Sequence, residues 1–561
     1  MNPSTFLRPT PLALAVCLLG MVVAAQAQQA PDAGQILRQQ QAPQVQPTPP
    51  GTAVEVQPPA AVVTPPGGAR VQLQAVEFSG HSVIADADLR AALGPAVGQS
   101  FDLAGLRGLA DRISALYRAS GYPFALAFLP PQPLTDGRLL IQIVEGRYGQ
   151  VRALADEPSV AAQAQPWLSA LRSGEVIHSP TLERSTLILD DLPGVAIAPV
   201  VRPGQAVGSG DLDVRVVRTP ALGGEVGLDN HGNRYTGAQR LRLNLQADSP
   251  LSFGDQCTAR LLYSNLDLWL GQLSYSLPLG TSGLRGNVGY AHTSYELGEE
   301  FASLGASGTA KVSSLGLSYP LLRSQRSNLT LTATWQHKRL NDRQQQAATN
   351  DHKTSNVVPL ALNFDHRDGF GGGAISYGSV GFSSGRLELG PALEAIDRAS
   401  GQHTRGGFQK WNLELARIQA TAVAGLTVFG RLSTQWASKN LDSSEGFGLG
   451  GATGVRAYPQ GEGGGDQGWL AQIELRYAIG AFSPYVFYDA GRITFNARPA
   501  DLTVPPTTNQ RSLAGAGVGA RYQQGPWSLD AALAWRTVGG RPQSDSRDRH
   551  PRLWLTAGYR F

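Results

Sequence analysis

Residues 553–561, LWLTAGYRF, place an apolar side chain at every second position, so that one face of an extended strand is uniformly apolar. The same two-residue period appears in residues 241–246, LRLNLQ, and in residues 329–335, LTLTATW. Segments of about ten residues with this alternation, separated by turns, are typical of transmembrane β-barrels. We therefore predict that residues 220–561 form a barrel of about sixteen strands, without a helix. A soluble β-sandwich is the alternative, because its strands also alternate.

The N-terminus has the features of a secretory signal peptide, which favours the membrane over the sandwich. Residues 12–25 form a short apolar run after Arg8, and the Ala-Gln-Ala sequence at residues 25–27 matches a cleavage site, so we predict a signal peptide over residues 1–27. The run is too short to span a bilayer as a helix. A mature chain that enters the membrane must then form a closed barrel, because only helices and closed barrels satisfy every backbone polar group in lipid.

Composition narrows the class of protein further. Charged residues make up 16% of the chain, against roughly 25% in ordinary soluble proteins. The formal net charge of +4 is small for 561 residues and no Lys/Arg block occurs, so we expect no nucleic-acid partner. The histidines show no ligand spacing, so we expect no metal and no other cofactor. Signal removal leaves Cys257 as the one cysteine, which excludes an intrachain disulfide.

Two regions precede the predicted barrel. Residues 28–69 are rich in Gln, Pro and Ala and read as an extended linker, apart from a short candidate helix at residues 32–41 that contains Ile36, Leu37 and Arg38. A helix this short is marginal in water, so it needs a surface on which to dock. Residues 70–147 and 148–219 each follow the order β-α-α-β-β. Consecutive copies of one α+β unit indicate a tandem array, and we expect no enzyme.

With these residues in view, the chain resembles the two-partner secretion transporters, the TpsB family. The two β-α-α-β-β units look like polypeptide-transport-associated (POTRA) domains, and residues 186–194, TLILDDLPG, resemble a signature of the second of them. Residues 32–41 look like the family's plug helix. The most specific match is residues 454–459, GVRAYP, in a long loop between two late strands, which resembles the VRGY motif of the wider POTRA-barrel superfamily. The motif residues are Val455, Arg456, Ala457 and Tyr458.

The resemblance also implies two carboxylates and a glycine on the barrel wall, at Glu474, Asp489 and Gly491. Glu474 alternates with apolar neighbours, so it faces the lumen if they face lipid, and Asp489 must face inward because a carboxylate on the lipid side is costly. An arginine fork suits bidentate pairing with carboxylates. On spacing alone we expect Arg456 to be a solvated residue of the loop. The resemblance instead implies that Arg456 pairs with the wall carboxylates and so fixes the loop to the wall, an arrangement called the lock below. Ala457 replaces the motif's glycine, which puts a positive φ in doubt there.

The resemblance implies a function and a location. We expect an outer-membrane translocation pore that recognises a large adhesin- or haemolysin-like exoprotein through periplasmic POTRA domains and secretes it. An insertase or assembly factor for outer-membrane barrels is one alternative, and a passive nutrient porin, which would have neither the POTRA domains nor the Arg456 motif, is the other. Other expected partners are outer-membrane lipid and lipopolysaccharide and, for biogenesis, the barrel-assembly machinery and periplasmic chaperones. The terminal Phe561 resembles a barrel-insertion signal. A literal G-x-S-x-G at residues 381–385 is set aside, because a hydrolase needs it on a strand-to-helix elbow.

Overall fold

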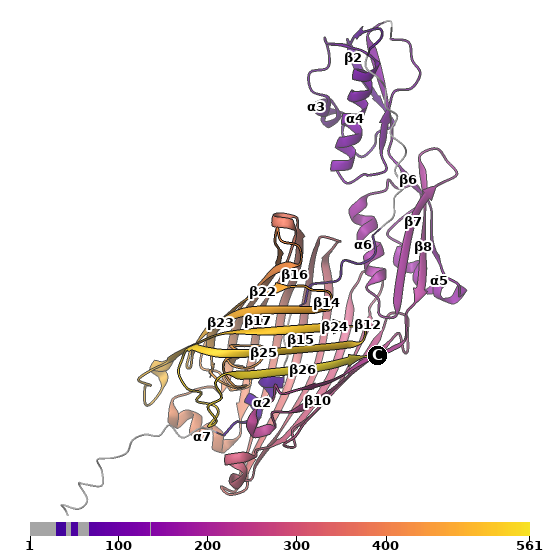
Figure 1. Ribbon diagram of the computed structural model, residues 1–561. Helices are drawn as coiled ribbons and strands as arrows, with labels where there is room; N and C mark the ends of the chain where they lie inside the picture. The colour runs from indigo at the N-terminus through magenta and orange to yellow at the C-terminus, as the bar shows by residue number, and fades with distance from the viewer. Residues whose placement is uncertain (1–29, 41–45, 54–66, 135) are drawn as a thin grey trace, which may run out of the picture.

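The computed structural model describes residues 30–40, 46–53, 67–134 and 136–561 (Figure 1). The predicted signal peptide lies outside the described residues. The described chain contains helix α2 (Ala33–Gln40), two α+β units and a large barrel, in that order. No helix among the described residues is both long and apolar enough to cross a membrane.

Sixteen antiparallel strands form a closed barrel, in which β26 pairs back onto β9. This closure confirms the predicted sixteen-stranded barrel and rules out the sandwich. The strands are β9 (Leu222–Asp229), β10 (Arg240–Asp248), β11 (Gln256–Ser264), β12 (Trp269–Pro278), β13 (Arg285–Glu296), β14 (Ala306–Arg323), β15 (Ser327–Gln344), β16 (Thr349–Asp368), β17 (Ala374–Leu389), β18 (Gly406–Ala420), β19 (Leu426–Ala437), β22 (Gln467–Tyr477), β23 (Phe482–Thr494), β24 (Gln510–Gln524), β25 (Trp527–Val538) and β26 (Arg552–Arg560).

The alternation that predicted the barrel separates its two faces. In β26, Leu553 and Leu555 are 48% and 46% exposed, whereas Trp554 between them is 4% exposed. An apolar row this exposed faces lipid in a membrane barrel, and the intervening row faces the lumen. The G-x-S-x-G sequence at residues 381–385 lies within strand β17, so it forms no hydrolase elbow.

The prediction of a barrel region without a helix is wrong. Helix α7 (Pro391–Ser400) lies in the connection between β17 and β18. Pro391 stands at its first turn, where its missing N–H costs nothing, and Gly401 ends it in the left-handed conformation. The connection lies beyond the barrel wall, where no neighbouring strand imposes extended pairing, so these local signals decide the structure.

Two three-stranded α+β units precede the barrel and project away from it (Figure 1). In each sheet the first long strand pairs in parallel with the last one, which gives the orders β2-β5-β4 and β6-β8-β7. The first unit contains β1 (Val71–Gln72), β2 (Ala75–Ser79), α3 (Asp86–Leu93), β3 (Ser100–Phe101), α4 (Leu103–Ala119), β4 (Leu126–Phe128) and β5 (Arg138–Val144). The second contains β6 (Arg147–Leu154), α5 (Pro158–Ala164), α6 (Ser179–Asp190), β7 (Val195–Pro203) and β8 (Ser209–Arg218).

A buried glutamate lies at the joint between the two units. Glu145 is 3% exposed and accepts hydrogen bonds from Tyr117 Oη at 3.0 Å and from the backbone N–H of Val83 at 2.9 Å. Ser82 also donates to it, and Arg147 from the second unit forms an ion pair with it at 3.0 Å. Burial alone would raise the pKa of Glu145, but the hydrogen bonds from Ser82, Val83 and Tyr117 together outweigh burial and lower it. The joint is therefore held by a charged carboxylate.

Candidate functional site

The connection between β19 and β22, residues 438–466, folds inward and is called the inward loop below. It carries a small hairpin, β20 (Phe447–Gly448) with β21 (Gly464–Gly465). Arg456 lies in this loop and is 5% exposed. Its Nε and Nη2 atoms donate to the two carboxylate oxygens of Asp489 at 2.8 and 2.6 Å, and its Nη1 atom donates to Glu474 at 2.5 Å. The structure therefore brings together the three residues that the resemblance selected.

The two carboxylates reach Arg456 from neighbouring strands of the barrel wall. Glu474 on β22 and Asp489 on β23 point into the lumen and are 4% and 0% exposed. Phe487 lies on the same face of β23, with its ring centroid 3.5 Å from Arg456 Cζ, so the guanidinium stacks on an aromatic face. Glu474 is also paired with Arg521 at 3.1 Å. A charge buried this deeply is tolerated because each partner is paired and hydrogen-bonded.

The rest of the motif fixes the backbone around Arg456. Val455 and Tyr458 are fully buried, and the Tyr458 hydroxyl donates to the carbonyl of Val538 at 2.7 Å. Ala457 is not among the described residues with positive φ, so alanine fits where the motif usually has glycine. A Cβ added to Gly515 on the barrel wall would lie 2.4 Å from Ala457 Cβ. This close contact therefore requires the glycine at position 515 of the wall. Gly491 similarly leaves room for a leucine of the inward loop.

Further buried ion pairs tie the inward loop to other sides of the lumen. Glu445 lies between Lys338 of β15 and Lys410 of β18, at 2.6 and 2.9 Å. Glu462 is fully buried and pairs with Arg511 of β24. The loop is therefore bound to the adjacent strands β22, β23 and β24 on one side of the wall and, through Glu445, to β15 and β18.

Helix α2 lies inside the barrel (Figure 1). Ile36 and Leu37 are 0% and 4% exposed and pack in one cluster with Leu262, Tyr295 and Leu340 from the walls of β11, β13 and β15. Arg38 points toward the inward loop, since a Cβ on Gly464 would lie 2.8 Å from its Nη2 atom. The lumen supplies the docking surface that so short a helix requires.

Asp32, at the start of α2, links the helix to both the wall and the loop. It accepts from the backbone N–H of Gln35 at 2.8 Å, as an N-cap does. It also pairs with Lys353 of β16 at 2.8 Å and accepts from Ser443 of the inward loop at 2.7 Å. Lys353 pairs in turn with Asp442 of the loop at 2.7 Å. One lysine therefore holds the plug and the loop together.

A cavity of about 500 Å³ lies beside the Arg456 cluster and is lined by charged side chains of the wall. Gln46 of the linker also lines it. The described part of the linker therefore runs through the lumen past Arg456. The terminal Phe561 lies at the closing seam, where it exchanges backbone hydrogen bonds with Gly224 at 3.0 and 3.1 Å.

Sequence reasoning did not identify Asp32, Ser443 and Lys353 as a set, nor Arg521 as a partner of Glu474. Lys353 carries a weak signal, because a lysine in a membrane strand is costly unless it faces the lumen. Nothing in the sequence indicates its partners, which are 321 and 89 residues away.

Fold and site together define a class of protein: an outer-membrane β-barrel with a plugged lumen, preceded by two periplasmic POTRA units. The sequence profile described as "Haemolysin secretion/activation protein ShlB/FhaC/HecB" matches residues 208–522, and that described as "POTRA domain, ShlB-type" matches residues 71–146. The first match covers more than half of the chain. The chain belongs to the ShlB/FhaC/HecB haemolysin secretion/activation family and is a two-partner secretion transporter of the outer membrane.

Individual relatives agree with this assignment. The heme/hemopexin transporter protein HuxB of Haemophilus influenzae (strain 86-028NP) is 26% identical over 500 residues, which cover 86% of each chain. The outer membrane transporter CdiB of Escherichia coli O6:K15:H31 (strain 536 / UPEC) is 23% identical over 422 residues, covering 73% of this chain and 69% of that protein.

Solved structures share the fold. CdiB from Escherichia coli has a TM-score of 0.70 at 20% identity, covering 92% of this chain and 94% of that one. CdiB from Acinetobacter baumannii has a TM-score of 0.65 at 17% identity, covering 92% and 95%.

Proposed function

We propose that this transporter exports one large protein partner as an extended chain through the lumen now occupied by α2. The observation that carries the proposal is the plug itself. Its eight residues join the rest of the chain through a linker, and its charged N-cap Asp32 is held by side chains of the wall and the loop. A helix with few covalent constraints leaves a pore more readily than a folded domain does.

In this proposal the POTRA units capture the partner. Strand β4 lies at an edge of the first sheet, and its Leu126 and Phe128 are 49% and 37% exposed. An extended chain adds to such an edge through main-chain hydrogen bonds, while apolar side chains of the edge favour apolar partners. The captured chain is the unfolded N-terminal secretion segment of the exoprotein.

Passage follows once α2 has left. Arg456, Glu474 and Asp489 then keep the inward loop in the conformation that conducts the chain, because separating them would leave buried charges without a partner. The drive is folding of the partner outside the cell, and no catalytic step is assigned. Biogenesis of the barrel involves the barrel-assembly machinery, periplasmic chaperones and outer-membrane lipid, with Phe561 as the insertion signal.

Deletion of residues 31–41 separates secretion from the alternative of a barrel insertase. In planar bilayers, single channels of the deletion variant should show a larger and longer-lived conductance than the intact chain, because the variant lacks the helix that fills the lumen. An intact chain with the same conductance as the variant would refute the plugged secretion pore. A heat-modifiable band in outer-membrane fractions controls for correct assembly of the variant barrel.

A further inference from the structure

The linker leaves the lumen at the joint between the barrel and the second POTRA unit, and there it is bound in place. Asp365 on β16 accepts from the backbone N–H of Thr48 at 3.1 Å, and Arg367 donates to the Thr48 carbonyl. At the other end, the N–H of Thr52 donates to Asp190 of α6 at 2.8 Å. Two linker residues are therefore held by their main-chain atoms.

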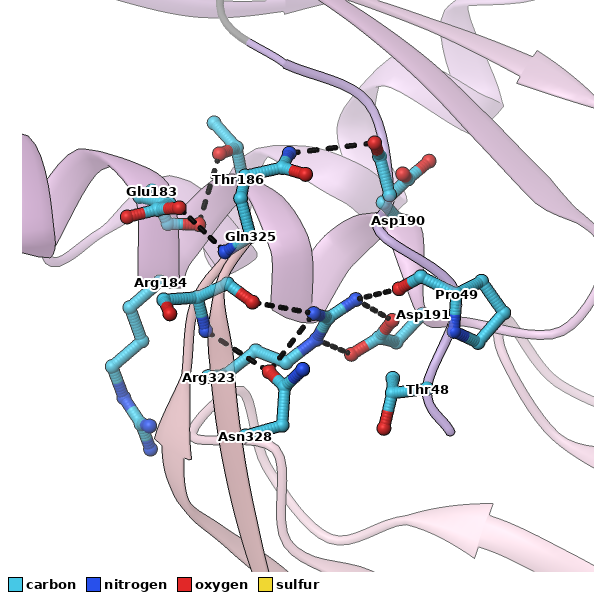
Figure 2. Close-up of polar contacts among 12 residues, drawn as sticks. Thr48, Pro49, Glu183, Arg184, Thr186, Asp190, Asp191, Arg323, Gln325 and Asn328 are labelled. Atoms are coloured by element: carbon cyan, nitrogen blue, oxygen red, sulfur yellow. Dashed lines mark hydrogen bonds and ion pairs between the residues drawn. The ribbon is translucent and has the colours of Figure 1, made fainter. Parts of the chain in front are cut away.

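Two more contacts between these ends also use the linker's main chain. Arg323, the last residue of β14, donates to the carbonyl of Pro49 at 3.5 Å (Figure 2). Gln325, in the following turn, donates to the carbonyl of Gly51 at 3.3 Å. The barrel and α6 thus offer both donors and acceptors along one line. We call Asp190, Arg323, Gln325, Asp365 and Arg367 the main-chain track.

Several side chains of the track are also held by contacts that do not involve the linker. Arg323 is 4% exposed and makes a two-point ion pair with Asp191, both bonds at 2.7 Å, and it donates to Asn328 at 3.1 Å (Figure 2). Asn328 donates in turn to Asp365 at 2.9 Å. Because partners on the barrel and on α6 fix these side chains, little conformational entropy is lost when an extended chain binds.

Recognition through the main chain is nearly independent of sequence. Every residue offers a carbonyl and every residue except proline an N–H, so a site that reads these groups accepts many extended chains. The exception is Gly51, which has a φ of +69° and whose added Cβ would lie 2.5 Å from Leu187 Cδ2. Among the linker residues that the structure describes, Gly51 is therefore a residue-specific anchor on an otherwise general surface.

We propose that the main-chain track is a docking site for an extended segment of the exported protein, and that the linker occupies it until the plug leaves. The inference rests on the proposed function, because it needs a translocated chain. It is supported by continuity, since the same linker lines the lumen cavity at Gln46 before it reaches the track. The linker thus shows a route between the track and the pore that an extended chain follows in the opposite direction.

Photo-crosslinking on the purified full chain tests the proposal. A benzophenone amino acid replaces Arg326, an exposed residue beside the track, or Val423 on another periplasmic turn as the positional control. The probe is reduced, carboxymethylated lactalbumin, an unfolded chain, and the same protein with its disulfides intact is the folded control. Gly51→Ala is the variant designed to release the linker, whereas Thr52→Ala retains the N–H that binds Asp190 and is the matched control.

Gly51→Ala should lower the crosslink from position 326 to the linker and raise capture of the unfolded probe about tenfold, the factor for forcing a left-handed conformation on alanine. Position 423, folded lactalbumin and Thr52→Ala should show no such rise. Adding Arg367→Gln should reduce probe capture again while the linker stays released.

Three results would overturn the inference: a linker that stays crosslinked in Gly51→Ala, a released linker without probe capture, or capture that is insensitive to Arg367→Gln. Export of the natural partner from cells is scored separately. Loss of the proposed function would appear there as an absence of secretion by the unaltered chain, whereas failure of the track alone would leave that secretion intact.

Discussion

Replacement of Arg456 by Ala is the strongest test of the lock between the inward loop and the wall. The change removes three charged hydrogen bonds and leaves Asp489, which is fully buried, without its cation. Glu474 keeps Arg476 and Arg521 as partners, so the cost falls mainly on Asp489. Breaking a buried pair costs about 3–5 kcal/mol, and because Glu474 keeps these partners we expect Arg456→Ala to cost about 3 kcal/mol.

A change of this size shifts the equilibrium between bound and released loop by roughly a hundredfold. Hydrogen exchange of peptides covering residues 449–460, measured on the detergent-solubilised protein, should accelerate by up to that factor. Secretion of the partner into the medium should fall, while the amount of heat-modifiable barrel in the outer membrane stays the same.

Two further variants make the test specific. Arg541→Ala removes an ion pair whose arginine is 87% exposed, so it should change neither exchange nor secretion. Asp489→Asn in the Arg456→Ala background removes the unpaired charge and should recover part of the loop's protection. Wild-type exchange and secretion in Arg456→Ala would refute the lock and return Arg456 to the status of a solvated loop residue.

Two other predictions concern the plug and the periplasmic joint. Lys353→Gln leaves Asp32 without its cation, so single channels of this variant should open more often than those of wild type. The control is Lys311→Gln, which replaces an exposed lysine. Equal opening in the two variants would show that Lys353 does not hold the plug. Glu145→Gln should speed amide exchange at Ser82, because a neutral amide accepts more weakly than a carboxylate. The pKa of Glu145 is lowered on folding, so its contribution to stability is present above about pH 4.5 and is lost as the pH falls through the folded pKa. The difference in exchange rate between Glu145→Gln and wild type should therefore shrink below that pH. A difference that stays constant with pH would contradict the mechanism.

The two-residue periodicity of the strands predicted most of the fold. The prediction was wrong where the chain leaves the sheet, because the periodicity has no physical basis there. Alternation such as that of residues 553–561 reports a sheet with one face in lipid, so it predicted the barrel; the inward direction of Asp489 followed from the cost of a carboxylate facing lipid. It contains no information about segments outside the sheet, and helix α7 was missed for that reason. The local signals of α7, Pro391 and Gly401, are visible in the sequence but are outweighed by a surrounding pattern of strands.

By itself, the sequence determined the architecture: a Pro- and Gln-rich linker, two α+β repeats and a barrel, each set by local composition and period. The tertiary structure alone decided how the lumen is closed. Asp32 meets Lys353 and Ser443 across 321 and 411 residues of chain, and Thr48 meets Asp365 across 317. Such contacts depend on which strands face each other across the pore, and that arrangement exists only once the barrel has closed on itself.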